Sequence, residues 1–574
     1  MLTTLLNTAW MWQSRGESRA FHRATHDIGT CQEDLLRKTL RNNAACDYGQ
    51  RFGFGTIGSL KEYQDRVPIC DYGTLRPEID AIASGRPGVL TTEPVLMMEP
   101  TGGSSGGTKL IPYTATLRRQ FQRAIAAWMH DVLSRYPGVR GGRSYWSISP
   151  AVQRPPRTPG GVRVGFDSDT EYLAGWQQWA MRRLVAVPSA VAKQRNIENF
   201  QYATLASLVA AGDLSLISVW SPTFLTGLIR RLPEWWERIL SDLEAGDWSW
   251  PAPDAVDRSH PFPPLKLPRR AAMLRDVFTN HELPAEQLAR VWPNLALVSA
   301  WGDAAAELFV PALRGLFPTV PIQPKGLLAT EGVISFPWNE SVAPALAVCS
   351  HVFEFVPVES LPDVGQPPRW SWELETGVSY RVLLTTGGGL YRYDLGDLVE
   401  VTGFRQRCPL LKFVGRGTVG SDLVGEKLHE DHVRRAVREG CRELGMEPHF
   451  ALVVPITQQS PGYRALLVCN FRADTPASQS SIEARLATAI ERGLLENSQY
   501  RYATQLGQLR PLEVRLLKAS AESAWSVYEA ECRRRGQKSG DIKPTTLVQG
   551  ADWDGLLDLL EPQHATSGVK SDIH

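Results

Sequence analysis

Three short stretches constrain the fold of this chain more than any other feature of its sequence. They are TGGSSGGTK at 101–109, LLATEG at 327–332 and YRYDLGD at 391–397. The first is a loop rich in glycines and hydroxyls that ends in Lys109. Such a loop can wrap backbone N–H groups, hydroxyls and one cation around a polyphosphate. A fold that uses all three stretches must bring distant parts of the chain together.

The second and third stretches add oxygen ligands. Thr330 and Glu331 supply a hydroxyl and a carboxylate, and Asp397 is a carboxylate held directly after Leu395 and Gly396. A carboxylate fixed in this way suits the two hydroxyls of a ribose. The order of the three stretches therefore indicates a nucleotide site, and it points to ATP-dependent activation of a carboxylic acid.

Composition narrows the class of protein. The chain has 574 residues, of which 43% are hydrophobic, and this length predicts two or three domains. Its 62 Lys and Arg residues balance 61 Asp and Glu residues, so no overall charge draws it to nucleic acid or to an anionic membrane. The eight cysteines lie far apart without a CxxC pair, which argues against a zinc site and a disulfide scaffold. We expect small-molecule partners.

The start of the chain, MLTTLLNTAWMWQSR, has no early basic region and no long apolar run. Nowhere does the sequence approach the roughly 20 apolar residues of a membrane-spanning helix. We therefore expect a cytoplasmic protein. Separately, we expect a monomer or a weak homodimer.

The order of predicted elements indicates two kinds of sheet. Residues 1–45 are predicted to be helical, and the glycine loop is predicted to join two strands because LIPYT follows it. The segment 137–170 is predicted to be an irregular connection. Strands and helices alternate near LALVSAW, which predicts a parallel sheet, whereas 351–404 predicts antiparallel strands. After a glycine-rich segment at 415–425, the chain predicts a compact α+β unit.

These motifs resemble those of adenylate-forming enzymes, and the whole chain resembles the auxin-responsive Gretchen Hagen family of acyl acid amido synthetases, as a bacterial-type member. Four longer strings carry the resemblance besides the three motifs: KLIPYT, HVFEFVPVE, LYRYDLGDLVEVTGF and FVGRGTVGSDLVGEKL. They separate this family from ordinary acyl-CoA ligases.

The resemblance implies an α/β fold with a large N-terminal domain of β-sheets flanked by helices, including a β-barrel-like part, and a small mobile C-terminal α+β domain. The implied boundaries are 1–414 for the N-terminal domain, 415–425 for the hinge and 426–574 for the C-terminal lid. The implied reaction has two steps: ATP and an acid give an acyl-adenylate and pyrophosphate, and an amine, usually of an amino acid, then displaces AMP.

The resemblance also assigns roles to residues. Glu331 is expected to hold Mg²⁺ and to act in catalysis together with Lys427 and Lys543. The predicted nucleotide-binding residues are Thr101, Gly102, Gly103, Ser104, Ser105, Gly106, Lys109, Leu327, Ala329, Thr330, Glu331, Tyr391, Asp397, Arg416 and Lys427. The acyl pocket does not transfer from the family, because plant members carry different residues along it. Our own expectation is that Tyr202, Leu205, Trp220 and Phe224 bind the acyl acid.

Two positions depart from the family pattern. Pro100 stands where many relatives have a hydroxyl residue before the loop, and Leu327 stands where an aromatic side chain commonly stacks on adenine. The acid is expected to be aromatic, indolic or jasmonate-like.

Each motif also has an ordinary alternative. A TGGSSGG loop by itself is more often a linker than a phosphate cradle. Its GGSSG core fits the nucleophile elbow of a serine hydrolase with Ser104 as nucleophile, but a strand rather than a helix is predicted to follow. Thr108 stands where a Walker loop has lysine. ATEG and YRYDLGD alone would be ordinary turns, and Lys427 and Lys543 would be solvated lysines.

Three rival functions follow from these alternatives. A ligase that transfers the acyl group to coenzyme A or a carrier thiol would be active with a thiol acceptor. A catalytically silent nucleotide sensor would bind ATP and release no pyrophosphate. A serine hydrolase would be labelled at Ser104 by a fluorophosphonate.

Overall fold

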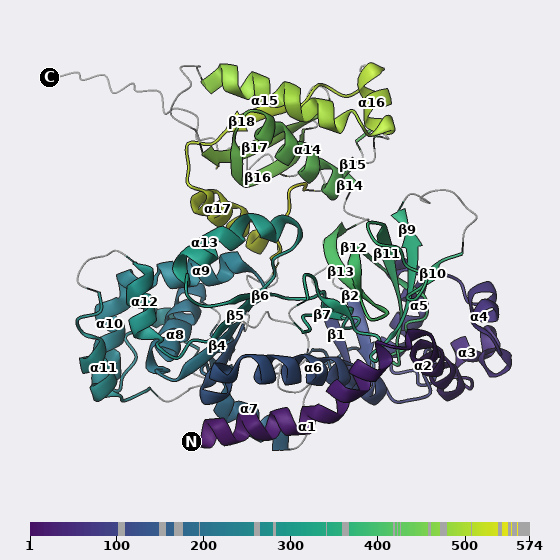
Figure 1. The fold of residues 1–574 in the computed structure, drawn as a ribbon, viewed down its shortest axis with the longest axis horizontal. Coiled ribbons are helices and arrows are strands. Elements are labelled where there is room, and N and C mark those ends of the chain that lie inside the picture. Colours follow the sequence, from purple (N-terminus) through teal and green to yellow (C-terminus); the bar gives the residue numbers. More distant parts are fainter. Residues whose placement is uncertain are drawn as a thin grey trace. The chain divides into compact units, whose positions relative to one another are not determined.

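The computed structural model describes residues 1–101, 109–147, 156–165, 176–194, 196–257, 264–278, 283–339, 341–358, 367–416, 420–421, 423–424, 426, 428–456, 461–470, 479–506, 508–535, 537, 542–548, 553 and 560. Contacts divide the chain into two compact units (Figure 1). One contains Met1–Val414, and the other contains Gly415–Gln537 and continues from Ile542. All three motifs belong to the first unit.

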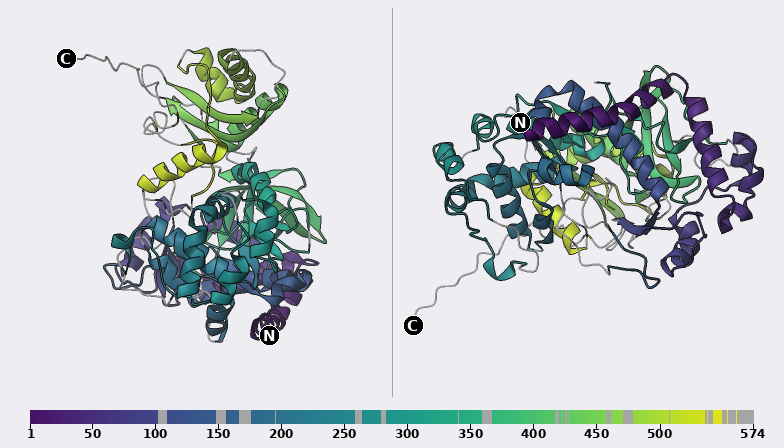
Figure 2. Two further views of the ribbon diagram at one scale, coloured as in Figure 1. Left: turned by 90° about the vertical axis from the view of Figure 1, so that its left-hand side faces the viewer. Right: turned by 90° about the horizontal axis from the view of Figure 1, so that it is seen from below.

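Helices open the first unit, as predicted for residues 1–45. They are α1 (Leu2–Ala24), α2 (Ile28–Asn42), α3 (Asp47–Arg51), α4 (Leu60–Arg66) and α5 (Tyr72–Ala83). Asp27 caps α2 by accepting the N–H of Thr30 at 3.2 Å, and Asp71 caps α5 by accepting that of Thr74 at 2.8 Å. Such caps satisfy N–H groups that have no partner within the helix. Helix α1 packs along α6 (Ala115–Arg135), as Figures 1 and 2 show.

The parallel sheet predicted near LALVSAW is confirmed. Its strands lie in the order β3 (Arg143–Trp146), β4 (Leu214–Ser218), β5 (Leu297–Ala300) and β6 (Ile322–Pro324), and every pair is parallel. All residues of β4 and β5 are buried, as expected for strands covered by helices on both faces. The chain between these strands forms α7 (Trp176–Leu184), α8 (Ile197–Ala210), α9 (Pro222–Arg230), α10 (Leu232–Ala245), α11 (Pro268–Leu274), α12 (Ala285–Val291) and α13 (Val310–Leu316).

One prediction about this region was wrong. The segment 137–170 was expected to be irregular, but Arg143–Trp146 forms strand β3. A four-residue strand at the edge of a sheet leaves little pattern in the sequence. Its strand conformation comes from pairing with β4, in which Tyr145 lies opposite Ile217.

Antiparallel strands form the rest of the first unit, as predicted. The hairpin of β1 (Met97–Thr101) and β2 (Lys109–Tyr113) flanks the glycine loop. A larger sheet has the order β10-β9-β11-β12-β13-β8-β7, and its described registers are antiparallel. Its strands are β7 (Ser335–Phe336), β8 (Ala345–Leu346), β9 (Val352–Pro357), β10 (Arg369–Trp370), β11 (Ser379–Thr385), β12 (Tyr393–Arg405) and β13 (Cys408–Arg416). This sheet corresponds to the expected β-barrel-like part, and its described strands end at β10 and β7.

The second unit has the predicted α+β composition and its own hydrophobic core. Strand β17 pairs antiparallel with β16 and parallel with β18. Its elements are β14 (Gly420–Ser421), β15 (Leu428–His429), α14 (Glu430–Glu443), β16 (Glu447–Ile456), β17 (Gly462–Asn470), α15 (Gln479–Leu494), α16 (Ser498–Gln505), β18 (Glu513–Leu516) and α17 (Ala521–Arg534). Of the described helices in both units, none has the length and apolarity needed to cross a membrane.

Candidate active site

The flanks of the glycine loop form the start of the candidate site. Thr101 and Lys109 face each other as the last register pair of the β1–β2 hairpin, so the loop between them is a strand-to-strand connection as predicted. The Lys109 ammonium lies 5.6 Å from the ring centre of Tyr72, whose hydroxyl accepts the N–H of Leu110 at 2.9 Å. The loop residues assigned to phosphate binding lie outside the described residues: Gly102, Gly103, Ser104, Ser105 and Gly106.

The second motif is a tight turn. Ala329 and Gly332 exchange backbone hydrogen bonds of 3.0 and 3.2 Å, which leaves Thr330 and Glu331 at the tip, both half-buried. A Cβ atom at Gly332 would lie 2.9 Å from both His351 and Leu384, so only glycine fits without displacing a neighbour.

Two buried side chains hold this turn. The Tyr113 hydroxyl, at the end of β2, donates to the Thr330 carbonyl at 2.5 Å. His351 accepts the N–H of Val333 through Nε2 at 3.1 Å. Burial lowers the pKa of His351 to about 3, so this imidazole is neutral and can accept that hydrogen bond. Because Tyr113 follows the glycine loop, its hydrogen bond ties the first motif to the second.

The third motif is anchored by a buried ion pair. The Arg392 guanidinium donates to both carboxylate oxygens of Glu354, at 3.1 and 3.2 Å, and these side chains are 4% and 2% exposed. It also donates to the Gln64 and Val67 carbonyls at 2.7 and 2.6 Å. The backbone of Arg392 is left-handed, with φ of 48°, which costs energy for a residue other than glycine. These contacts offset that cost and fix the start of β12.

Strand β12 also pairs with residues before α5. Asp394 donates its N–H to the Cys70 carbonyl at 2.8 Å, and Cys70 donates its own to the Arg392 carbonyl at 3.2 Å. Tyr393 and Asp394 are thereby placed beside the start of α5, where Tyr72 contacts Lys109. The third motif therefore lies next to the flank of the first.

Charged groups of the three motifs also act on one another or on a shared neighbour, Asp71. Burial raises the pKa of Tyr393, and the Glu331 carboxylate raises it further. Hydrogen bonds from Thr74 lower the pKa of Asp71, and Lys109 adds to this effect. Asp71 in turn acts on Tyr393. Lys109 of the first motif, Glu331 of the second and Tyr393 of the third are therefore linked through their charges, directly or through Asp71.

Two aspartates of β12, Asp394 and Asp397, contribute carboxylates to the candidate site. Burial raises the pKa of Asp394, which pairs with Arg381 at 3.3 Å and also senses the charge of Asp397. Asp397 is 2% exposed. Its placement beside Asp394 makes it part of the cluster, and its assignment to a ribose stays a prediction.

Two predicted nucleotide-binding side chains lie in the core instead. Tyr391 is fully buried, stacks on Tyr48 at 5.2 Å and donates its hydroxyl to the Leu90 carbonyl at 2.8 Å. Leu327 is 8% exposed and packs in the same core. Tyr391 therefore has a structural role in positioning β12, and an adenine contact by Leu327 stays a prediction.

Aromatic residues collect at the carboxyl ends of the parallel strands. Trp146 ends β3, and Trp220 and Trp301 follow β4 and β5, with their rings 5.5 Å apart. Lys325 follows β6 and is 4% exposed. Its ammonium donates to the Ser218 hydroxyl at 2.9 Å and lies 4.3 Å from the Trp220 ring and 5.9 Å from the Trp146 ring. In open α/β sheets, ligands bind at this edge.

The predicted acyl-binding residues divide between this edge and the core. Trp220 is at the edge. Tyr202 and Leu205, on α8, are fully buried in the second hydrophobic core, and the Tyr202 hydroxyl donates to Asp242 at 2.6 Å. Phe224, on α9, belongs to the same core. These three side chains are used in core packing, and their assignment to the acyl acid stays a prediction.

Sequence reasoning missed Trp146, Trp301 and Lys325. Each directly ends or follows a strand of the parallel sheet, and Lys325 lies two residues before the second motif. The position of a residue at the carboxyl end of a buried strand was the signal that could have found them.

The C-terminal candidates belong to the second unit. Lys427 lies outside the described residues, and Arg416 ends β13. Lys543 is half-buried and precedes a segment that pairs with β16, in which Val453 donates to the Thr546 carbonyl at 2.6 Å. Thr546 donates its own N–H to Glu430 at 2.7 Å. Catalytic roles for these residues stay predictions.

Known proteins resemble this chain along nearly its whole length. It is 24% identical to the indole-3-acetic acid-amido synthetase GH3.8 of Oryza sativa subsp. indica, covering 86% of this chain and 84% of that protein. It is 23% identical to GH3.3 of Arabidopsis thaliana, covering 87% and 86%. The solved structure of the AtGH3.15 acyl acid amido synthetase in complex with 2,4-DB has a TM-score of 0.80 at 20% identity, covering 95% of this chain and 96% of that one.

Matches to family domains follow the order of the chain. Residues 17–322 match the GH3 family N-terminal domain, 345–416 the central domain and 431–552 the C-terminal domain. The central domain spans the larger antiparallel sheet from β8 to β13, which contains the third motif. The chain belongs to the GH3 family.

Proposed function

We propose that this protein is an ATP-dependent acyl acid amido synthetase. The acid's carboxylate oxygen attacks the α-phosphorus of ATP, the bond to the β-phosphate oxygen breaks, and pyrophosphate leaves. The amine nitrogen of an amino acid then attacks the acyl carbon, loses a proton and displaces AMP. The observation that carries the proposal is that hydrogen bonds bring the three motifs together. Tyr113, which follows the glycine loop, donates to the Thr330 carbonyl at 2.5 Å, and β12 pairs with Cys70 beside the start of α5, where Tyr72 contacts Lys109.

The motif residues have distinct tasks in this reaction. Lys109 supplies positive charge next to the phosphates, and the Thr330 hydroxyl supplies a donor. Preorganised donors of this kind each contribute roughly 3 kcal/mol of transition-state stabilisation. Asp397 receives the ribose. The undescribed loop residues, with Ser104 and Ser105, complete the phosphate contacts.

A magnesium ion fits the donors at this place. Mg²⁺ is usually held by one or two carboxylates together with substrate phosphates. Glu331 offers one half-buried carboxylate at the tip of the turn, and the described residues contain no closed cluster of three or more metal-binding side chains. When bound, the ion neutralises phosphate charge, while the chain holds Glu331 in position through the Tyr113 and His351 contacts.

The acyl acid is assigned to the carboxyl edge of the parallel sheet. Tryptophans 146, 220 and 301 provide flat apolar surfaces suited to an aromatic or indole acid. Lys325 provides a fixed cation that attracts the carboxylate. The short sequence between Lys325 and Glu331 connects this edge to the nucleotide motifs.

The remaining parts of the proposal concern the roles of residues in the second unit, the two substrates, the cellular compartment and the oligomeric state. Lys427 and Lys543 act on the α-phosphate or the acyl oxygen from a lid formed by 426–574, and 415–425 serves as the hinge. The two substrates are a small acyl acid and an amino acid, and the protein is a cytoplasmic monomer or weak homodimer.

Pyrophosphate release tests the function. Aryl, indolyl and aliphatic acids are supplied with ATP and Mg²⁺, with and without pooled amino acids. We expect acid-dependent release that rises with amino acids and falls at least a hundredfold in Glu331→Ala. Release that rises instead with coenzyme A would identify a thiol ligase, and ATP binding without release from any acid would identify a sensor.

A further inference from the structure

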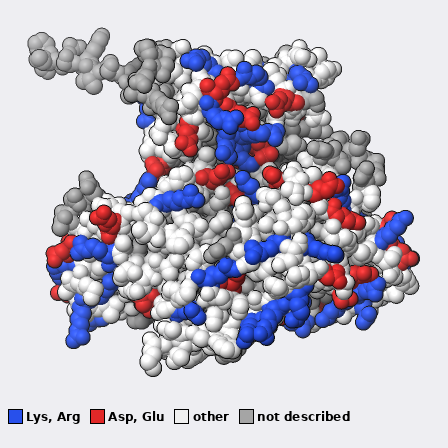
Figure 3. Space-filling model, viewed as in Figure 1, with Lys and Arg blue, Asp and Glu red and all other residues white. Residues whose placement is uncertain are grey.

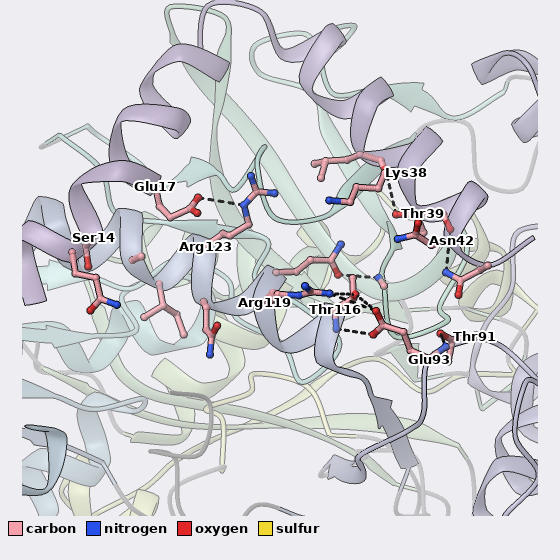
Figure 4. Close-up of a pocket in the computed structure, with 18 of the residues that line it drawn as sticks. Ser14, Glu17, Lys38, Thr39, Asn42, Thr91, Glu93, Thr116, Arg119 and Arg123 are labelled. Carbon is pink, nitrogen blue, oxygen red and sulfur yellow. Dashed lines mark hydrogen bonds and ion pairs between the residues drawn. The ribbon is translucent and has the colours of Figure 1, made fainter. Parts of the chain in front are cut away.

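A cavity of about 530 Å³ lies between α1, α2 and α6 in the first unit (Figure 4). This volume falls within the roughly 300–1,000 Å³ of typical small-molecule sites. Among its lining residues are Ser14, Lys38, Glu93, Arg119 and Gln120. No described residue of the three nucleotide motifs or of the tryptophan edge lines it, so this cavity is separate from the proposed active site.

Positive charge exceeds negative charge around the cavity. Three cations line it, Lys38, Arg119 and Arg123, against the two carboxylates of Glu17 and Glu93. Figure 3 shows Lys and Arg side chains gathered over α1 and α6.

The ion pairs in this cavity are weak. Arg119 lies 3.5 Å from Glu93 and Arg123 lies 3.2 Å from Glu17, and both arginines are well exposed. Ion pairs between exposed side chains contribute little, so a bound anion can replace either carboxylate as the partner of an arginine. Within the described part of the chain, the Lys38 ammonium has no hydrogen-bond or ion-pair partner. It is available for an anionic ligand.

Two buried donors also face the cavity. Ser14 is 3% exposed and Gln120 is 6% exposed. The Gln120 side-chain oxygen accepts the N–H of Gly387 at 2.9 Å, which leaves its amide nitrogen without a partner among the described residues. The Ser14 hydroxyl likewise has no hydrogen-bond partner in the part of the chain that the structure describes. Both donor atoms are open to the cavity rather than enclosed in the core, so they can donate to an acceptor-rich ligand bound there.

We propose that this cavity binds a small organic oxyanion, that is, a molecule whose carboxylate or phosphate groups meet Lys38, Arg119 and Arg123. The Ser14 hydroxyl and the Gln120 amide donate to its oxygens. Its apolar part lies against Trp10, which is 8% exposed and lines the same cavity. Polycarboxylates and phosphates share this chemistry.

Isothermal titration calorimetry on the full chain tests the proposal. Citrate and inorganic phosphate are the two probes, titrated without ATP or acyl acid at ionic strength matched with chloride. We expect saturable binding of at least one probe, and the tighter of the two identifies a polycarboxylate or a phosphate as the ligand class. Lys38→Gln and Arg119→Gln should each weaken it about tenfold, because each removes a charge-assisted contact.

Matched control variants distinguish binding in the cavity from non-specific attraction of the anion to positive charge on the surface. Lys61→Gln removes an exposed lysine on α4, and Arg76→Gln removes an arginine that is 72% exposed and pairs loosely with Asp80. Both should bind the probe as wild type does. Absence of saturable binding, or equal weakening by Lys61→Gln and Lys38→Gln, would overturn the proposal. Glu331→Ala should retain the binding, so loss of pyrophosphate release and loss of this site are distinguishable.

Discussion

The nucleotide motifs and the carboxyl edge of the parallel sheet are built in opposite ways. The second and third motifs are short runs of residues whose backbone is held by buried partners, as His351 holds the turn at 327–332 and Glu354 holds Arg392. The edge instead takes one side chain from each of four strands, and Trp146 and Lys325 come from opposite ends of the sheet. Contiguous motifs can therefore be predicted from the sequence, whereas the residues of the edge can be identified only once the strand order is known.

The largest effect is expected from a substitution that removes the buried ion pair between Arg392 and Glu354, which anchors the third motif. Arg392→Met leaves the Glu354 carboxylate buried at 2% exposure without its cation, and removing one partner of a buried pair costs about 3–5 kcal/mol. We expect a corresponding drop in the urea midpoint of the tryptophan fluorescence transition.

Two controls interpret that result. Arg76→Met removes an exposed arginine and should change the midpoint little. The double variant Glu354→Met with Arg392→Met removes both charges and should recover much of the loss. A loss below about 1 kcal/mol in Arg392→Met would mean that this ion pair does not support the motif.

A smaller effect concerns the turn of the second motif and its dependence on pH. Burial lowers the pKa of His351 to about 3, well below its ordinary value. Below about pH 6.5 the unfolded chain binds a proton that the folded chain does not, so the contribution of His351 is complete above that pH and declines as pH falls toward 3. Between pH 7 and pH 5 wild type should lose about 2 kcal/mol more than His351→Gln, whose amide oxygen can still accept the Val333 N–H.

Urea titrations at the two pH values measure this difference, because all other titrating groups are common to both proteins. His351→Asn is a useful companion, since its shorter amide cannot reach Val333 equally well and should lower stability at both pH values. Parallel pH profiles for wild type and His351→Gln would show that the imidazole is not held neutral in the fold.

These cases show what the sequence can predict. Glycine spacing and strand signals located Lys109 and Glu331, because a turn of this kind depends on neighbouring residues. The packing of Tyr391 against Tyr48, and of Tyr202 against Asp242, depends on residues far away in sequence. The sequence alone therefore suggests that a tyrosine within a motif, such as Tyr391, contacts the ligand, whereas in the structure its hydroxyl makes a hydrogen bond within the core. Strand β3 was missed for the same reason, since its pairing partner lies beyond α7 and α8.

The smallest expected effect tests the edge itself. Lys325→Met keeps the length of the side chain and removes the charge beside Trp220. If this cation positions the acid, the KM for the acyl acid should rise about tenfold, the equivalent of one charge-assisted hydrogen bond, while the KM for ATP stays unchanged. Stability should hold or increase, because an apolar side chain replaces a buried charge. Lys412→Met, on β13, is the matched control and should alter neither constant. An equal rise in both KM values would assign Lys325 to the general architecture of the site, and an unchanged acid KM would place the acid elsewhere.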